Sequence, residues 1–166
     1  LKINSSSDTY VNSKYKVTIP ASWKKTDTES TSLTIVSPDY SQNSPSSKDA
    51  KERDLAEVTP VKSGSMIIMH TTDGKELSPS LLDPREYVRF KLKYAKDLTG
   101  FVTSKEISIN DSPAAYVKVR FENGSFAVYI NTIKNGEEYI INLHTTNDEL
   151  GSKALEYLLS SFEFIK

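Results

Sequence analysis

The 166-residue sequence contains no cysteine. Disulfide bonds, thiolate metal ligands and a cysteine nucleophile are therefore excluded from this chain. Long hydrophobic runs are missing as well: stretches such as residues 66–69 fall far short of the roughly 18 apolar residues that a membrane-spanning helix needs. We expect membrane contact only through an anchor that lies outside this chain.

Neither sign of charge predominates, because 21 Lys and Arg stand against 22 Asp and Glu, for a formal net charge of -1. No overall field draws such a protein to nucleic acid, and we expect no nucleic-acid partner. The chain starts at Leu1 with a polar, hydroxyl-rich stretch, and we expect that a signal or anchor segment has been removed upstream. Together these features predict an extracellular or cell-surface protein, secreted or lipid-anchored.

Several enzyme motifs are absent. The sequence has no G-x-S-x-G, no glycine-rich phosphate loop and no H-E-x-x-H. Ser65 has no histidine at a spacing that suggests a catalytic pair, so a general base would have to be assembled from distant segments. We therefore predict that the protein is not an enzyme, with a hydrolase of unrecognised site as an alternative.

Periodicity outlines one domain. Residues 1–13 are polar and predict a tether, and residues 38–62, which include the charged run SKDAKERDLAE, predict a mobile surface loop because too few apolar positions occur there to bury a face. The remaining length suffices for one core, so a single domain is expected over 14–166. Alternation of apolar and polar residues predicts strands at 15–19, 32–37, 66–72, 101–109 and 114–122.

A first helix is predicted to begin at Asp83, whose side chain can cap it, with Pro84 and Glu86 in the first turn. It should run to about Leu98, before Gly100. Lys91 falls within the apolar arc and should reach water or a carboxylate. The apolar arc, at about 100° per residue, contains Tyr87, Val88, Phe90, Leu92, Tyr94, Ala95 and Leu98.

A second helix is predicted from Asp148 to Ser161, capped by Thr146 or Asn147 and followed by a short strand at 162–165. Trp23, in a turn after the first strand, is expected to pack against the core. The residues that the second helix should pack together are Leu150, Ala154, Leu155, Tyr157 and Leu158.

Two Asn-Gly pairs, at 123–124 and 135–136, predict two-residue hairpin turns, because both central residues of such a turn need positive φ. These turns would pair residue 121 with 126, 119 with 128 and 117 with 130, and across the second turn 130 with 141 and 128 with 143. One sheet face would then be continuous core. That face contains Val117, Val119, Phe121, Phe126, Val128, Ile130, Ile141 and Leu143.

Antiparallel strands with two amphipathic helices predict an α+β fold. Four phrases, YKVTIPASWKK, INDSPAAYVKVRF, AVYINTIKNGEEYIINLHTT and LLSSFEF, resemble the PsbP-like family, named for an extrinsic subunit of the photosynthetic oxygen-evolving complex, over roughly residues 14–166. The resemblance implies an α/β/α sandwich with a central antiparallel sheet. It also implies a non-enzymatic binding or assembly protein, of a family that includes bacterial and archaeal lipoproteins and secreted proteins. The long segment 38–62 departs from the family's compact pattern.

The opposite sheet face is predicted to be mixed and polar. It could bind a small anionic or carbohydrate-like ligand through hydrogen-bond donors and aromatic surface, or it could be an ordinary solvated face. The predicted ligand-binding residues are Tyr116, Lys118, Arg120, Tyr129, Asn131, Asn142 and His144.

Two further surfaces are hypotheses. His70 and His144 occur in the similar phrases MHTTD and LHTTND, so they could bind a divalent metal such as zinc together with Asp73 and Asp148, although otherwise no cofactor is expected. A basic stripe on the first helix could contact a protein partner or lipid headgroups, or could simply be solvated. The stripe consists of Arg85, Arg89, Lys93 and Lys96.

Overall fold

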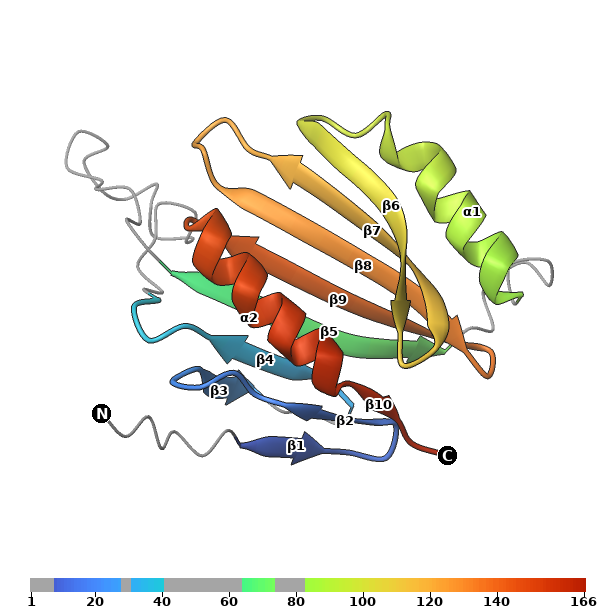
Figure 1. Cartoon of the computed structure of the whole chain (residues 1–166), viewed down its shortest axis with the longest axis horizontal. Helices are drawn as coiled ribbons and strands as arrows, with labels where there is room; N and C mark the ends of the chain where they lie inside the picture. Colours follow the sequence, from blue (N-terminus) through green and yellow to red (C-terminus); the bar gives the residue numbers. More distant parts are fainter. Residues whose placement is uncertain (1–7, 28–30, 41–63, 74–82) are drawn as a thin grey trace.

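The computed structural model describes residues 8–27, 31–40, 64–73 and 83–166, and its main feature is a seven-stranded antiparallel sheet (Figure 1). The strand order is β3-β4-β5-β9-β8-β7-β6, so neighbours along the chain are mostly neighbours in space. The strands of this sheet are β3 (Lys24–Asp27), β4 (Leu33–Val36), β5 (Ser65–Asp73), β6 (Phe101–Ile109), β7 (Ser112–Arg120), β8 (Phe126–Lys134) and β9 (Glu137–Thr145).

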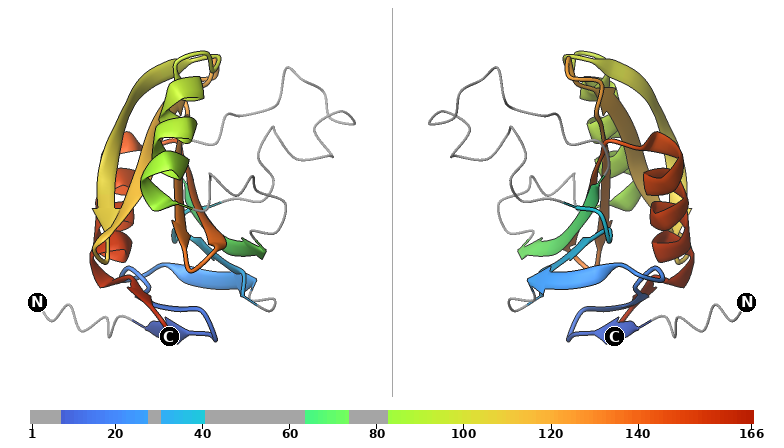
Figure 2. Two further views of the ribbon diagram at one scale, coloured as in Figure 1. Left: turned by 90° about the vertical axis from the view of Figure 1, so that its right-hand side faces the viewer. Right: turned by 90° about the vertical axis from the view of Figure 1, so that its left-hand side faces the viewer.

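Two helices cover opposite faces of this sheet, as Figure 2 shows. The helix α1 (Pro84–Ala95) packs on β7 and β8, whereas α2 (Asp148–Ser161) packs on β9 and β2. A smaller antiparallel sheet, β1-β2-β10, consists of Thr9–Val11, Tyr15–Thr18 and Glu163–Phe164. The predicted α+β class and the three-layer α/β/α sandwich are therefore confirmed.

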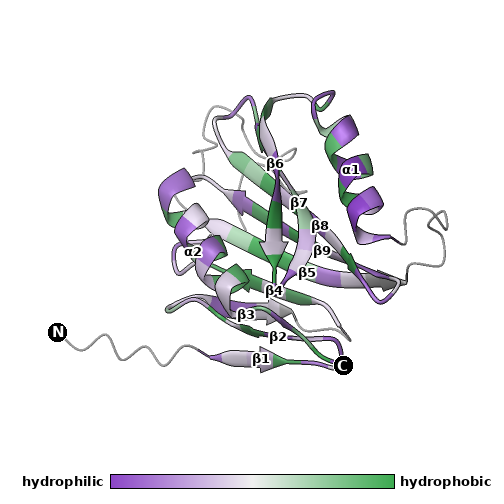
Figure 3. Cartoon of the chain, turned by 45° about the vertical axis from the view of Figure 1, so that its right-hand side comes forward, coloured by the Kyte–Doolittle hydropathy of each residue, from purple (hydrophilic) through white to green (hydrophobic). Residues whose placement is uncertain are grey.

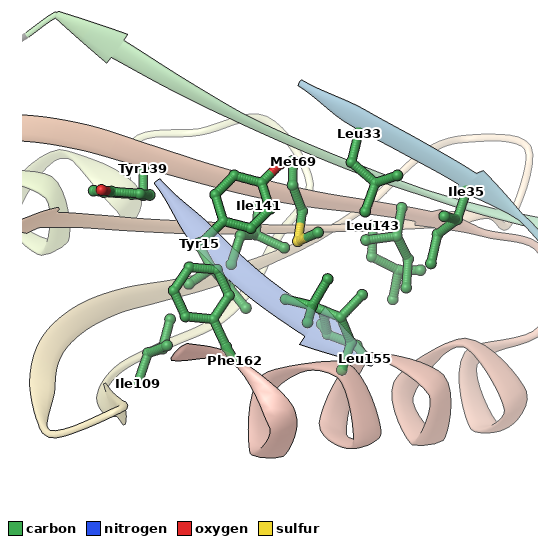
Figure 4. Packing of buried hydrophobic residues seen from close by; sticks show 14 of the residues in the cluster. Tyr15, Leu33, Ile35, Met69, Ile109, Tyr139, Ile141, Leu143, Leu155 and Phe162 are labelled. Carbon is green, nitrogen blue, oxygen red and sulfur yellow. The ribbon is translucent and has the colours of Figure 1, made fainter. Parts of the chain in front are cut away.

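The main core lies between the sheet and α2 (Figure 4). Alternate residues of the central strands, such as Ile141 and Leu143, point into it because successive side chains of a strand point to opposite faces. Tyr15 from β2 stacks on Phe162 at 5.5 Å between ring centroids, which ties the small sheet to the end of α2. Trp23 packs against the same core, as predicted.

The first Asn-Gly pair corrects the predicted register. Phe121 pairs with Ser125 around a three-residue loop in which Gly124 has a φ of 86°, and β7 then pairs Val119 with Ala127 and Val117 with Tyr129. The prediction was wrong by one residue, which turns the β7 side chains to the opposite face. By contrast Asn135 and Gly136 both have positive φ, and the predicted pairing of 130 with 141 and 128 with 143 is confirmed.

The helix α1 starts where the sequence predicted, but its buried face matches the predicted apolar arc only in part. The Asp83 side chain accepts hydrogen bonds from the backbone N–H groups of Arg85 and Glu86. The helix ends at Ala95, three residues earlier than predicted, and Lys91 reaches Glu138 at 3.5 Å. Three residues assigned to the apolar arc are exposed: Phe90, Tyr94 and Leu98.

The second helix has the predicted bounds and is capped by Asn147, which accepts from the Leu150 N–H. Ala154, Leu155 and Leu158 are buried as expected, but Leu150 and Tyr157 are exposed, which corrects the predicted packing face.

The predicted polar tether at residues 1–13 is corrected in part, because residues 9–11 form the strand β1. The predicted mobile loop at 38–62 lies outside the described residues from position 41 onward. Within the described part of the chain, neither helix has the length and apolarity required to cross a bilayer.

Candidate functional site

The predicted ligand-binding set divides between the two faces of the sheet, because the β7 register differs by one residue from the predicted one. Four of its members remain together beside α1, and we call them the α1-side polar surface. The other three are on the face that α2 covers. The α1-side polar surface consists of Tyr129, Asn131, Asn142 and His144.

Asn142 occupies the centre of the α1-side polar surface, on the central strand β9. It lies opposite Tyr129 of β8 and opposite Ile68 of β5. Its side-chain oxygen Oδ1 is buried and accepts no hydrogen bond, the only buried side-chain polar atom without a partner among the residues that the structure describes. Since native proteins contain few such atoms, this oxygen marks a place where a donor is missing.

His144 lies at the end of the same surface, between two aromatic rings. Its imidazole is parallel to the Phe121 ring at 6.2 Å and edge-on to Tyr129 at 6.4 Å. Burial disfavours the charged imidazolium, so the pKa of His144 lies below the ordinary value of 6.5. The side chain is therefore neutral at pH 7.

This environment predicts a measurable pH dependence. An NMR titration of the His144 ring should give a midpoint below 6.5. Between pH 7 and pH 5 the unfolded chain binds more protons than the folded one, so this residue lowers the free energy of unfolding as the pH falls. The variant His144→Gln should show a shallower loss of stability over that range. A His144 midpoint at or above 6.5 would contradict the burial argument.

A polar cluster fixes α1 at the other end of this face. The hydroxyl of Tyr87, a fully buried residue, donates a hydrogen bond to the Glu138 carboxylate, and Lys91 also approaches that carboxylate. Burial, followed by the bond to Glu138, raises the pKa of Tyr87 well above its ordinary value. Both charges of the Lys91–Glu138 pair are thus engaged within the protein.

Tyr116, Lys118 and Arg120 lie on the α2 side. Lys118 is bound by Asp148 of α2, at 2.7 and 2.8 Å from the two carboxylate oxygens. Lys118 and Arg120 both approach the face of the Phe126 ring, at 4.7 and 5.6 Å from its centroid. The structure therefore separates these cations from the α1-side polar surface.

The predicted metal ligands do not form one cluster. His144 lies opposite Met66, whereas His70 lies opposite Ile140, so the two histidines are four residues apart along the strands, about 13 Å. Asp148 is on the other face with Lys118, and the side chain of Asp73 lies outside the described residues. In the described ranges no group of three or more His, Asp or Glu side chains is placed to hold a metal ion.

The basic stripe of α1 is exposed, and exposed apolar residues that sequence periodicity assigned to the core occur on the same helix. Hydrophilic and hydrophobic residues alternate along α1 in Figure 3. Arg85 and Arg89 are paired with Glu106 and Glu86 respectively. Lys93 and Lys96 have no carboxylate within ion-pair distance among the described residues.

The apolar part of this surface begins with an aromatic pair. Phe90 and Tyr94 are 41% and 53% exposed, and their rings meet edge to face at 5.1 Å. Leu98, 45% exposed, follows in the turn after the helix. Their spacing of four residues was visible in the sequence, but a helix pattern alone cannot distinguish a buried arc from an exposed row at its border.

Among solved structures similar to this chain, a protein from Bacteroides thetaiotaomicron matches with a TM-score of 0.57 and 14% identity over 92% of this chain. The match covers only 45% of that longer protein. Cyanobacterial PsbP from Synechocystis matches with a TM-score of 0.49 and 12% identity, over 99% of this chain and 96% of PsbP. A Pseudomonas aeruginosa protein of unknown function matches with a TM-score of 0.45 and 15% identity, over 91% and 90%.

No family model matches the chain, and no curated protein sequence matches it. The fold is the α+β sandwich with a central antiparallel sheet that the sequence predicted, and the Bacteroides protein shares it. At such low identity the likeness concerns the fold alone, and roles on a shared fold have to be argued from the surfaces of each protein.

Proposed function

We propose that this chain is a non-enzymatic binding protein of the cell surface, secreted or lipid-anchored, that binds an acidic protein partner through the outer surface of α1. The observation that carries the proposal is the exposed Phe90–Tyr94 ring pair beside Lys93 and Lys96. Large apolar side chains that remain exposed side by side are typical of interaction surfaces. We propose the cell-surface location from the hydroxyl-rich composition and from the resemblance of the sequence phrases to a family with secreted and lipid-anchored members.

The charges around this pair favour an acidic partner. Lys93 lies over the Tyr94 ring at 5.7 Å, and neither it nor Lys96 is neutralised by a carboxylate among the described residues. Protein interfaces usually have an aromatic or apolar core and a polar rim. Here Phe90 and Tyr94 would supply the buried area, and the lysines at the rim would attract the opposite charge. Arg85 and Arg89, already paired, would contribute less.

Photo-cross-linking in cells that make the protein naturally tests the proposal. With p-benzoylphenylalanine at position 94, we expect one discrete covalent adduct with another protein. The adduct should disappear when Lys93→Glu and Lys96→Glu are added, because reversed charges repel an acidic partner. The matched control places the same group at Tyr157, 45% exposed on α2, where no such adduct should form. Equal adducts from both positions, or none from position 94, would refute the proposal.

A further inference from the structure

We propose that the α1-side polar surface is a binding site for a neutral saccharide, with Asn142 as its central hydrogen-bond acceptor. This site is separate from the outer surface of α1 and does not depend on the protein partner suggested above.

The side-chain oxygen of Asn142 lacks a hydrogen-bond donor and so indicates a place for a ligand. A buried acceptor that has lost its hydrogen bonds to water and gained no other donor destabilises the fold, and buried polar atoms of this kind are rare in native proteins. Asn142 Oδ1 is in this state among the described residues, on the central strand β9. Asn142 as a residue is only partly buried, so its side chain can turn this oxygen outward, where a hydroxyl group of a ligand over β9 would supply the missing donor.

The α1-side polar surface carries no unpaired charge among its described residues. Tyr129, Asn131 and Asn142 are uncharged side chains, and burial keeps His144 neutral at pH 7. At the far end of this surface, Lys91 and Glu138 form an ion pair at 3.5 Å and neutralise each other. Neither an anion nor a cation therefore meets an unpaired opposite charge on the described part of this surface, which favours a neutral ligand.

The observed β7 register also favours a neutral ligand over an anionic one. The predicted set of seven residues contained two cations, Lys118 and Arg120, and was compatible with an anionic ligand. The observed pairing of Lys118 with Val128 and of Arg120 with Phe126 puts both cations on the face that α2 covers. The four residues that remain include no lysine or arginine to attract an anion.

The α1-side polar surface combines hydrogen-bonding side chains with aromatic rings, as a saccharide site requires. Tyrosine, asparagine and neutral histidine can each both donate and accept a hydrogen bond, as can every hydroxyl of a sugar. Next to them, Phe121 and His144 present parallel rings at 6.2 Å, and Phe121 is 39% exposed. A sugar ring has an apolar C–H face that can lie on an aromatic ring while its hydroxyls bond to the neighbouring polar side chains. A few polar groups beside aromatic surface are what a small-molecule site usually offers.

The test is a titration of the ¹⁵N-labelled protein, followed by NMR, with maltotriose and N-acetylglucosamine as neutral probes and galacturonic acid as an anionic one. We expect at least one neutral sugar to shift the resonances of Tyr129, Asn142 and His144 at millimolar concentration, and galacturonic acid to bind more weakly. Absence of shifts with both neutral sugars overturns the proposal. Equal or tighter binding of galacturonic acid overturns the neutral class of ligand.

The variant Asn142→Leu separates binding from folding. It should weaken sugar binding at least tenfold without lowering Tm, because leucine is of similar size and removes the buried oxygen that has no partner. A Tm several degrees lower would show that water or a protein group already donates a hydrogen bond to the Asn142 oxygen, which contradicts the proposal. Arg120→Gln, on the opposite face, is the matched control and should bind like the original protein.

Discussion

The variant Gly100→Ala should unfold at a much lower temperature than the original protein. Gly100 has a φ of 78°, and a Cβ atom added there would lie 2.1 Å from the carbonyl oxygen of Arg120. This oxygen belongs to the backbone at the end of β7 and cannot rotate away, while the N–H of Arg120 donates to Gly100 O at 2.8 Å. Backbone strain and steric overlap together should lower the free energy of unfolding by about 3 kcal/mol or more. Chemical denaturation measures this change.

Gly136→Ala is a close control for this effect. Gly136 also has a φ of 78°, but nothing lies within 4 Å of an added Cβ. Only the left-handed backbone conformation is then penalised, by about 1–2 kcal/mol. If the two variants lose equal stability, the contact between Gly100 and β7 is not as close as the structure indicates.

The second large effect is expected for Phe162→Ala. Phe162 is 3% exposed and joins α2 to the main core, with ring centroids at 5.5 Å from Tyr15 and 4.9 Å from Phe164. Loss of a fully buried phenylalanine leaves a cavity between helix, sheet and the small β1-β2-β10 sheet. The free energy of unfolding should fall by about 3–5 kcal/mol, and Tm by roughly 6–20 °C for a domain of this size.

Phe90→Ala provides the comparison, because Phe90 is 41% exposed on α1. Its truncation should change stability by about 1 kcal/mol or less, since most surface substitutions have small effects. A loss of stability at Phe90 as large as that at Phe162 would mean that Phe90 supports the fold, and its proposed role in partner binding would lose its main support.

Features with local causes were predictable. The side chain of Asp83 caps α1 because an acceptor before Pro84 meets free backbone N–H groups within three residues. Asn135 and Gly136 form the tight turn between β8 and β9 because both adopt positive φ. Period-two alternation located the central strands, and periods near 3.6 located both helices.

The candidate site was only half predictable. Tyr129, Asn131, Asn142 and His144 were assigned to one face, since the β8–β9 register follows from the second turn. The side chains of three strands together leave Asn142 Oδ1 without a hydrogen-bond partner. No sequence pattern encodes this missing partner. The exposure of Phe90 and Tyr94 depends on where α1 meets β7 and β8, which its own periodicity does not specify.

The sequence by itself determined the central strands, the two helices, the fold class and the pairing of β8 with β9, because each of these follows mainly from patterns and contacts among residues close along the chain. Only the tertiary structure decided the pairing of β7 with β8. An Asn-Gly pair permits a two-residue or a three-residue loop, and the two differ by one residue in register. The three-residue loop directs Val117 and Val119 under α1 and Lys118 toward Asp148 of α2, so burial of valines and pairing of the lysine select it over the alternative.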